Sequence, residues 1–187
     1  MKHLWSPWRS HHVESWSTRS EALQDGPSLF SRLLAENEDE KNLILWRGDL
    51  VFVIMNRFPY NNGHLMILPY REVARYTDLT GEEQTAIARA IDRCMRWIEH
   101  ALQPDGFNVG INQGEAAGAG IPQHLHVHVV PRWRADTNFM PTIGEVKVIP
   151  EALPDTYRKL RRAIEALEPS ADVQEAPPSP APEAARS

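Results

Sequence analysis

The chain has 187 residues, 42% of them hydrophobic, which suits one domain with a substantial core. A formal net charge of −5 gives no general basic surface, so no nucleic-acid partner is expected. Cys94 is the one cysteine, which excludes an intrachain disulfide and a Cys-rich zinc site. Because neither a signal peptide nor an apolar run long enough to span a membrane is recognised, we expect a cytoplasmic protein with no membrane partner.

The first 42 residues predict an N-terminal arm followed by a short helix. Trp5, Trp8 and Trp16 lie among prolines and polar residues, which is typical of an irregular arm anchored by aromatic rings. Apolar residues recur at helical spacing between positions 27 and 38. The acidic run at 36–40 is predicted to be a solvated turn.

Apolar segments then predict a sheet. Residues 43–46 and 50–55 flank an Arg-Gly-Asp turn, a pattern typical of a β-hairpin. Further strands are predicted at 64–69 and 107–112.

The clearest helix is predicted at 81–102. Thr80 and Glu83 form a capping box, and Cys94 falls on the apolar face, so it is interpreted as a core residue. A last helix is predicted at 155–167, with Leu167 on its apolar side.

Residues 123–131 alternate histidine with aliphatic residues. In a strand, alternate side chains share a face, so three histidines would line one face and three aliphatic residues the other (His124, His126 and His128; Leu125, Val127 and Val129). The plain alternative is a strand with a wet, histidine-rich face, but three histidines in phase favour a chemical site.

A glycine-rich loop at 113–120 leads into this segment, and such loops can form anion-binding nests of backbone N–H groups. A phosphate held beside imidazoles would allow nucleophilic attack on phosphorus. Three imidazoles could instead bind Zn²⁺. The residues alone leave both chemistries open.

The run of residues 124–130 resembles the His-φ-His-φ-His-φ-φ signature of the histidine triad (HIT) family. Asn56 and His64, eight residues apart, resemble the family's upstream pair, and the likeness covers about 43–131. Residues 4–9 and 136–141 are similar to the bacterial branch that resembles diadenosine tetraphosphate phosphorylases.

The resemblance implies an α+β fold, an antiparallel sheet with a long packed helix, in a homodimer. It implies nucleotidyl transfer from the α-phosphate of dinucleoside polyphosphates or related nucleotide conjugates. His126 would be the nucleophile, with its ring held by the His124 carbonyl. His128 would contact the leaving group, and His64 would support the neighbouring rings.

Nucleotide and phosphate contacts are expected from five residues (Asn56, Asn112, Gln113, Gly118 and Gly120). Three apolar residues could flank the base or serve the core alone (Phe52, Val53 and Met55). No cofactor is expected in the protein, although Mg²⁺ could arrive with the nucleotide substrate. Three parts of the chain are expected: an arm with a short helix, a HIT-like domain and a disordered Pro/Ala-rich tail (1–42, 43–168 and 169–187).

Two departures from the family are visible. Many relatives bind a structural zinc through a Cys-x-x-Cys pair and two histidines that resemble His64 and His124. Residues 15–31 contain no cysteine, so no such zinc site is predicted, and the aromatic arm could replace it. Ile121 stands where many members have a hydroxyl. The alternatives to a covalent-histidine enzyme are a zinc-dependent hydrolase and a non-catalytic nucleotide-binding module.

Overall fold

The computed structural model describes residues 26–134, 136 and 151–168. The aromatic arm, most of 136–141 and the expected tail lie outside these residues. The elements along the chain are α2 (Leu29–Ala35), α3 (Asp39–Asn42), β1 (Ile44–Arg47), β2 (Val51–Met55), β3 (Leu65–Pro69), the 3-10 turn η2 (Tyr76–Asp78), α4 (Gly81–Leu102), β4 (Gly106–Ile111), the 3-10 turn η3 (Glu115–Ala117), β5 (Val127–Arg132) and α6 (Leu153–Leu167).

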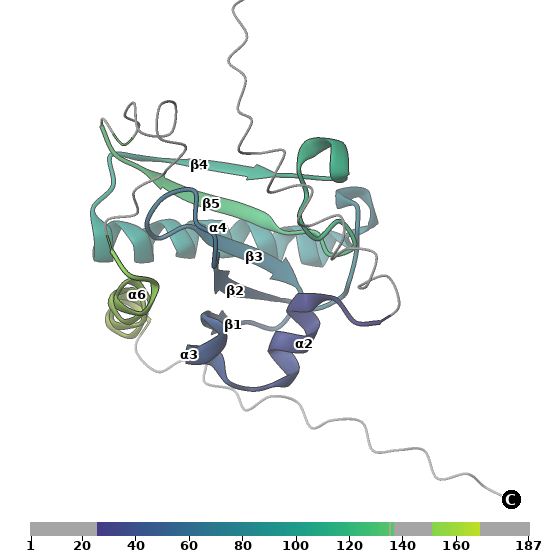
Figure 1. The fold of residues 1–187 in the computed structure, drawn as a ribbon, viewed down its shortest axis with the longest axis horizontal. Helices are drawn as coiled ribbons and strands as arrows, with labels where there is room; N and C mark the ends of the chain where they lie inside the picture. The colour runs from purple at the N-terminus through teal and green to yellow at the C-terminus, as the bar shows by residue number, and fades with distance from the viewer. Residues whose placement is uncertain (1–25, 135, 137–150, 169–187) are drawn as a thin grey trace, which may run out of the picture.

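The five strands form one antiparallel sheet in the order β1-β2-β3-β5-β4. Figure 1 shows α4 running behind this sheet, where it packs against β2, β3 and β5, while α6 packs against α4 and β1. The predicted α+β architecture with a long packed helix is therefore confirmed. Among the described helices, none is long and apolar enough to cross a membrane.

The predicted hairpin is present as β1 and β2. The Gly48 N–H donates to the Val51 carbonyl at 2.9 Å, which closes the turn. A Cβ at Gly48 would lie 2.1 Å from the Trp46 ring, so a side chain at this position would force that ring to move. Glycine therefore lets Trp46 fold over the turn.

The long helix begins and ends where the sequence predicts. Thr80 accepts from the Glu83 N–H at 3.1 Å, and the Glu83 carboxylate accepts from the Thr80 N–H at 2.8 Å. Each side chain thus satisfies one free donor of the first turn. Cys94 is fully buried, and its burial raises the pKa of the thiol.

One expectation about the outer segments is wrong. The acidic run is not only a turn, because Asp39 begins the four-residue helix α3. The Asn42 side chain donates to the Leu33 carbonyl at 3.0 Å, which ties α3 to α2. In α6, Leu167 lies in the last turn and is 44% exposed.

Candidate functional site

The histidine segment enters the sheet later than predicted. Strand β5 begins at Val127, so only His128 of the three triad histidines belongs to it. Upstream, the Leu125 N–H donates to the Val73 carbonyl at 2.7 Å, which takes Leu125 out of the ladder with β3. The three histidines are all buried, but His124 and His126 lie in the irregular segment before the strand.

His64 and His128 meet across β3 and β5. Met66 lies directly opposite His128, and His64 is two residues from Met66 on the same face. The His64 Nε2 and His128 Nδ1 atoms are 2.9 Å apart. The Tyr60 ring covers both imidazoles, with centroids 4.6 Å from His64 and 5.6 Å from His128.

The hydrogen bonds determine which nitrogens of this pair carry protons. The Tyr60 N–H donates to His64 Nδ1 at 3.0 Å, so a neutral His64 carries its proton on Nε2. That proton is donated to His128 Nδ1, which leaves the His128 proton on Nε2. Within the described part of the chain, no protein group accepts from this buried Nε2. His128 is therefore a hydrogen-bond donor available to a bound ligand.

His126 has the opposite arrangement. Its Nδ1 lies 2.9 Å from the His124 carbonyl oxygen, and because a carbonyl can only accept, Nδ1 carries the proton. Nε2 of His126 therefore keeps its lone pair. The His126 and His128 rings are 4.9 Å apart at 80°. A potential nucleophile thus lies beside a potential donor.

The His124 ring is engaged at both nitrogens. Nε2 donates to the Pro69 carbonyl at 2.8 Å, and Nδ1 lies 2.7 Å from the Ser28 hydroxyl, which therefore donates to it. Phe30 from α2 packs edge-on against this ring, with centroids 5.7 Å apart. The sequence interpretation missed Ser28, although Ser28-x-x-Ser31 has the spacing of the absent Cys-x-x-Cys.

Burial keeps the triad neutral. Removal from water lowers the pKa of His124, His126 and His128, and for His128 the nearby His126 adds to burial to give a pKa of about 4. The hydrogen bond to the His124 carbonyl opposes this effect on His126 only in part. Unprotonated imidazole is the form that can attack an electrophile.

This burial predicts a loss of stability in acid. The pKa of His128 is lowered from 6.5 to about 4 on folding. Its contribution to the free energy of unfolding is therefore complete above pH 6.5 and is lost as the pH falls towards 4. The full effect is about 3 kcal/mol. Between pH 7 and 4.5 the melting temperature of His128→Gln should therefore fall less than that of the wild type. His100→Gln, at an exposed position of α4, should follow the wild type. Parallel curves for all three proteins would contradict the prediction.

The upstream residues lie around the His64–His128 pair. Asn56 Nδ2 is 3.4 Å from His64 Nδ1, and Asn56 Oδ1 accepts from the Phe58 N–H at 2.9 Å. Asn112 Nδ2 lies 3.5 Å from the Tyr60 hydroxyl. Asn56 and Asn112 are thus brought near the site, together with Tyr60, which sequence reasoning missed because no motif marks it.

For Gln113 and the glycine loop, the hydrogen bonds lead to other parts of the chain and not to the His64–His128 pair. The Gln113 side chain accepts from the Tyr76 N–H at 2.8 Å, which ties the loop to η2. The Gly118 N–H donates to the Glu115 carbonyl at 2.8 Å within the loop. A phosphate would therefore compete with that bond, although Gly118 and Gly120 are both exposed. Strand β4 contributes Gly110 opposite His128, and a Cβ there would meet no atom within 4 Å, so this side is open.

The residues considered for the base have core positions. Phe52, Val53 and Met55 are at most 2% exposed, so the core role holds for each of them.

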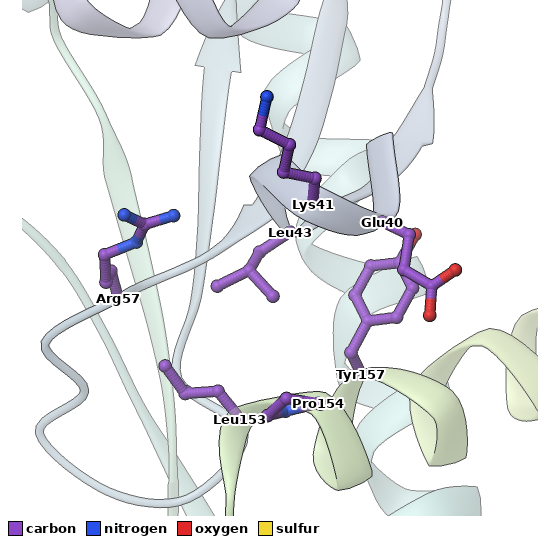
Figure 2. A pocket seen from close by; sticks show the side chains of 7 residues that line it. All are labelled: Glu40, Lys41, Leu43, Arg57, Leu153, Pro154 and Tyr157. Atoms are coloured by element: carbon purple, nitrogen blue, oxygen red, sulfur yellow. The ribbon is translucent and has the colours of Figure 1, made fainter. Parts of the chain in front are cut away.

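A cavity of about 390 Å³ lies elsewhere, between α3 and α6, with Arg57 on one side and Tyr157 on the other, and no histidine lines it (Figure 2).

The two histidines that the resemblance assigns to the relatives' zinc site have different hydrogen-bond partners. His64 contacts His128, whereas His124 contacts Ser28. Across the ranges that the structure describes, no group of three or more His, Cys, Asp or Glu side chains is arranged to hold a metal ion. The three triad rings therefore do not converge there as a zinc-ligand set.

A five-stranded antiparallel sheet with a buried cluster of histidine side chains identifies an α+β protein with a histidine-lined site. The HIT domain model matches residues 36–135, and the chain belongs to this family. An AP-4-A phosphorylase of Mycobacterium tuberculosis is 41% identical over 161 residues, which cover 86% of this chain and 83% of the relative. A bis(5'-nucleosyl)-tetraphosphatase [asymmetrical] of Schizosaccharomyces pombe is 34% identical over 50% of each chain. The predicted HIT-type enzyme is thus confirmed.

Solved structures share the fold. A Zn-bound histidine triad family protein from Mycobacterium smegmatis is 25% identical, with a TM-score of 0.62 over 75% of this chain and 94% of that one. A Hit-like protein from Bartonella henselae is 21% identical, with a TM-score of 0.60 over 74% of this chain and 98% of that one.

Proposed function

We propose that this enzyme transfers a nucleotidyl group from the α-phosphate of a dinucleoside polyphosphate through a covalent nucleotidyl-histidine, and that inorganic phosphate is the preferred acceptor. The observation that carries the proposal is the 2.9 Å contact between His126 Nδ1 and the His124 carbonyl. This contact keeps the ring proton on Nδ1 and leaves a lone pair on Nε2. The 41% identity to an AP-4-A phosphorylase supports the substrate class and the acceptor.

In the first step, His126 Nε2 attacks the α-phosphorus. A P–N bond forms as the bond from phosphorus to the departing bridging oxygen breaks. The ring gains positive charge but keeps its Nδ1 proton, so its bond to the His124 carbonyl becomes charge-assisted. The His128 Nε2–H donates a hydrogen bond to the departing oxygen, which stabilises the polyphosphate anion without a full proton transfer.

In the second step, an oxygen of inorganic phosphate attacks the same phosphorus. The P–N bond breaks, His126 Nε2 recovers its lone pair, and a nucleoside diphosphate leaves. Asn112, Gln113 and the 118–120 loop are assigned to phosphate contacts, the two glycines through backbone N–H groups. Mg²⁺ is assigned to the substrate, and no resident cofactor takes part.

Incubation with diadenosine tetraphosphate, with and without inorganic phosphate, tests the acceptor. ADP beside ATP only when phosphate is present indicates a phosphorylase, whereas AMP beside ATP indicates a hydrolase. If neither pair appears, this substrate is excluded.

Asn56→Ala should raise KM about tenfold, which corresponds to one lost hydrogen bond to the nucleotide. The value of kcat should change less than threefold, because the Tyr60 N–H still fixes the His64 tautomer. Steady-state kinetics checks this. Asn62→Ala is the matched control, since Asn62 accepts from Thr156 on α6 at 2.9 Å. An unchanged KM with a collapsed kcat would contradict the assigned role.

A homodimer is proposed on the basis of strand β4. It pairs with β5 on one side and forms the edge of the described sheet, where Val109 is 42% exposed. Such an edge can pair with a second copy. Sedimentation velocity should give a dimer for the wild type and a smaller species for Val109→Asp. A cytoplasmic location and the three-part division at residues 42 and 168 are proposed with it.

A further inference from the structure

We propose that Ser28 is a positioning residue that holds the nucleophilic His126 through His124. The role rests on the proposed function, but Ser28 itself lies outside the matched HIT region, which begins at residue 36. Its hydroxyl is 2.7 Å from His124 Nδ1, and both groups are completely buried.

The link from Ser28 to the nucleophile has two hydrogen bonds. The Ser28 hydroxyl and the Pro69 carbonyl hold the two ring nitrogens of His124, so this ring cannot rotate without losing both bonds. The same residue supplies the carbonyl that accepts from His126 Nδ1. A shift of His124 therefore moves the acceptor that fixes the tautomer of His126.

Ser28 is itself held by a second element. The Glu72 carboxylate accepts from the Ser28 N–H at 2.8 Å and from the Ser31 hydroxyl. Burial of Glu72 opposes its ionisation, but these hydrogen bonds lower its pKa below the usual value. The negative charge also lies at the start of α2, where it is favourable. The neighbouring Val73 carbonyl holds the Leu125 N–H at 2.7 Å, so one loop supports both sides of His124.

Ser28→Ala is the decisive variant. It should lower the single-turnover rate of label transfer to His126 about tenfold at saturating substrate, with KM changed less than threefold. In long-range ¹H–¹⁵N spectra of the substrate-free protein, His126 should change from one Nδ1–H tautomer to a mixture. A role in helix stability alone would lower the melting temperature but change neither readout well below it.

The Ser28 hydroxyl also caps α2 by accepting from the Ser31 N–H at 3.2 Å, and two further variants test whether this hydroxyl itself is required. Ser31→Ala removes a neighbouring hydroxyl whose hydrogen bonds within the described residues go to Glu72 and Ser28, so its rate and tautomer should match the wild type. Ser28→Thr keeps a hydroxyl and should restore both readouts, and if it does not fold, the comparison of the two alanine variants decides. A wild-type His126 spectrum and rate in Ser28→Ala, or equal losses in Ser31→Ala, would overturn the proposal. The substrate-free spectrum is independent of the proposed reaction, whose failure would instead appear as no label on the wild type.

Discussion

His126→Ala should abolish turnover while leaving nucleotide binding nearly unchanged. The variant removes the only triad nitrogen that combines a lone pair with a position beside the His128 donor. A phosphoramidate is labile to acid, unlike a phosphoester to Ser or Thr. Brief mixing with substrate labelled at the α-phosphate should leave acid-labile label on the wild type and none on His126→Ala.

His128→Ala is the matched comparison for the nucleophile variant. It should slow the first step yet still accumulate label, since His128 supports the leaving group without forming the covalent bond. Residual turnover in His126→Ala within about tenfold of the wild type, a barrier change of only about 1.4 kcal/mol, would rule out the covalent mechanism.

Of the substitutions proposed for this protein, Trp97→Ala should lower the free energy of unfolding most, by about 3–5 kcal/mol, because it leaves a cavity where a large ring was fully packed. Trp97 is 1% exposed, its ring centroid lies 6.1 Å from that of Trp46, and its Nε1–H donates to Glu168 at 3.0 Å. Glu168 also pairs with Arg93 at 3.3 Å, so this ring joins α4 to the end of α6. Thermal unfolding should show a melting temperature lower by roughly 10 °C.

Two variants calibrate the effect of Trp97. Trp97→Phe keeps an aromatic ring but loses the bond to Glu168, so its melting temperature should be intermediate. Arg96→Ala, one residue earlier on α4, removes only an exposed pair with Asp92 and should change stability by less than about 1 kcal/mol. Equal losses in Arg96→Ala and Trp97→Ala would contradict a packing origin, because alanine favours the helix at both positions.

The regular elements could be predicted because local patterns specify them. The helix 81–102 carries its own cap at Thr80 and Glu83, and the hairpin carries Gly48, so neither depends on distant residues. The end of α6 at Leu167 was predicted, but the 44% exposure of this residue depends on which distant residues pack there, which no local pattern states. The start of β5 likewise depends on the bond between Leu125 and Val73, residues far apart in sequence.

The contact between the His126 ring and the His124 carbonyl was expected from the family resemblance, whereas other contacts of the site were not predicted. The motif located three histidines, and the upstream spacing located His64 and Asn56. The contact between His64 and His128 follows from the register of β3 and β5, which pattern alone does not fix. Ser28 lies 96 residues from His124 along the chain, so its contact could be found only in the folded structure.

Main-chain groups decide the protonation of the two imidazoles assigned to the reaction. The His124 carbonyl sets the tautomer of His126, and the Tyr60 N–H sets that of His128 through His64. Substitution of side chains other than His64, His124 and Ser28 therefore leaves the acid and base assignments unchanged. The relatives named as a phosphorylase, a tetraphosphatase and a triphosphatase fit such latitude. Selectivity for the acceptor can therefore change through side-chain substitutions while the backbone groups keep the two tautomers fixed. This makes the choice of acceptor a target for redesign.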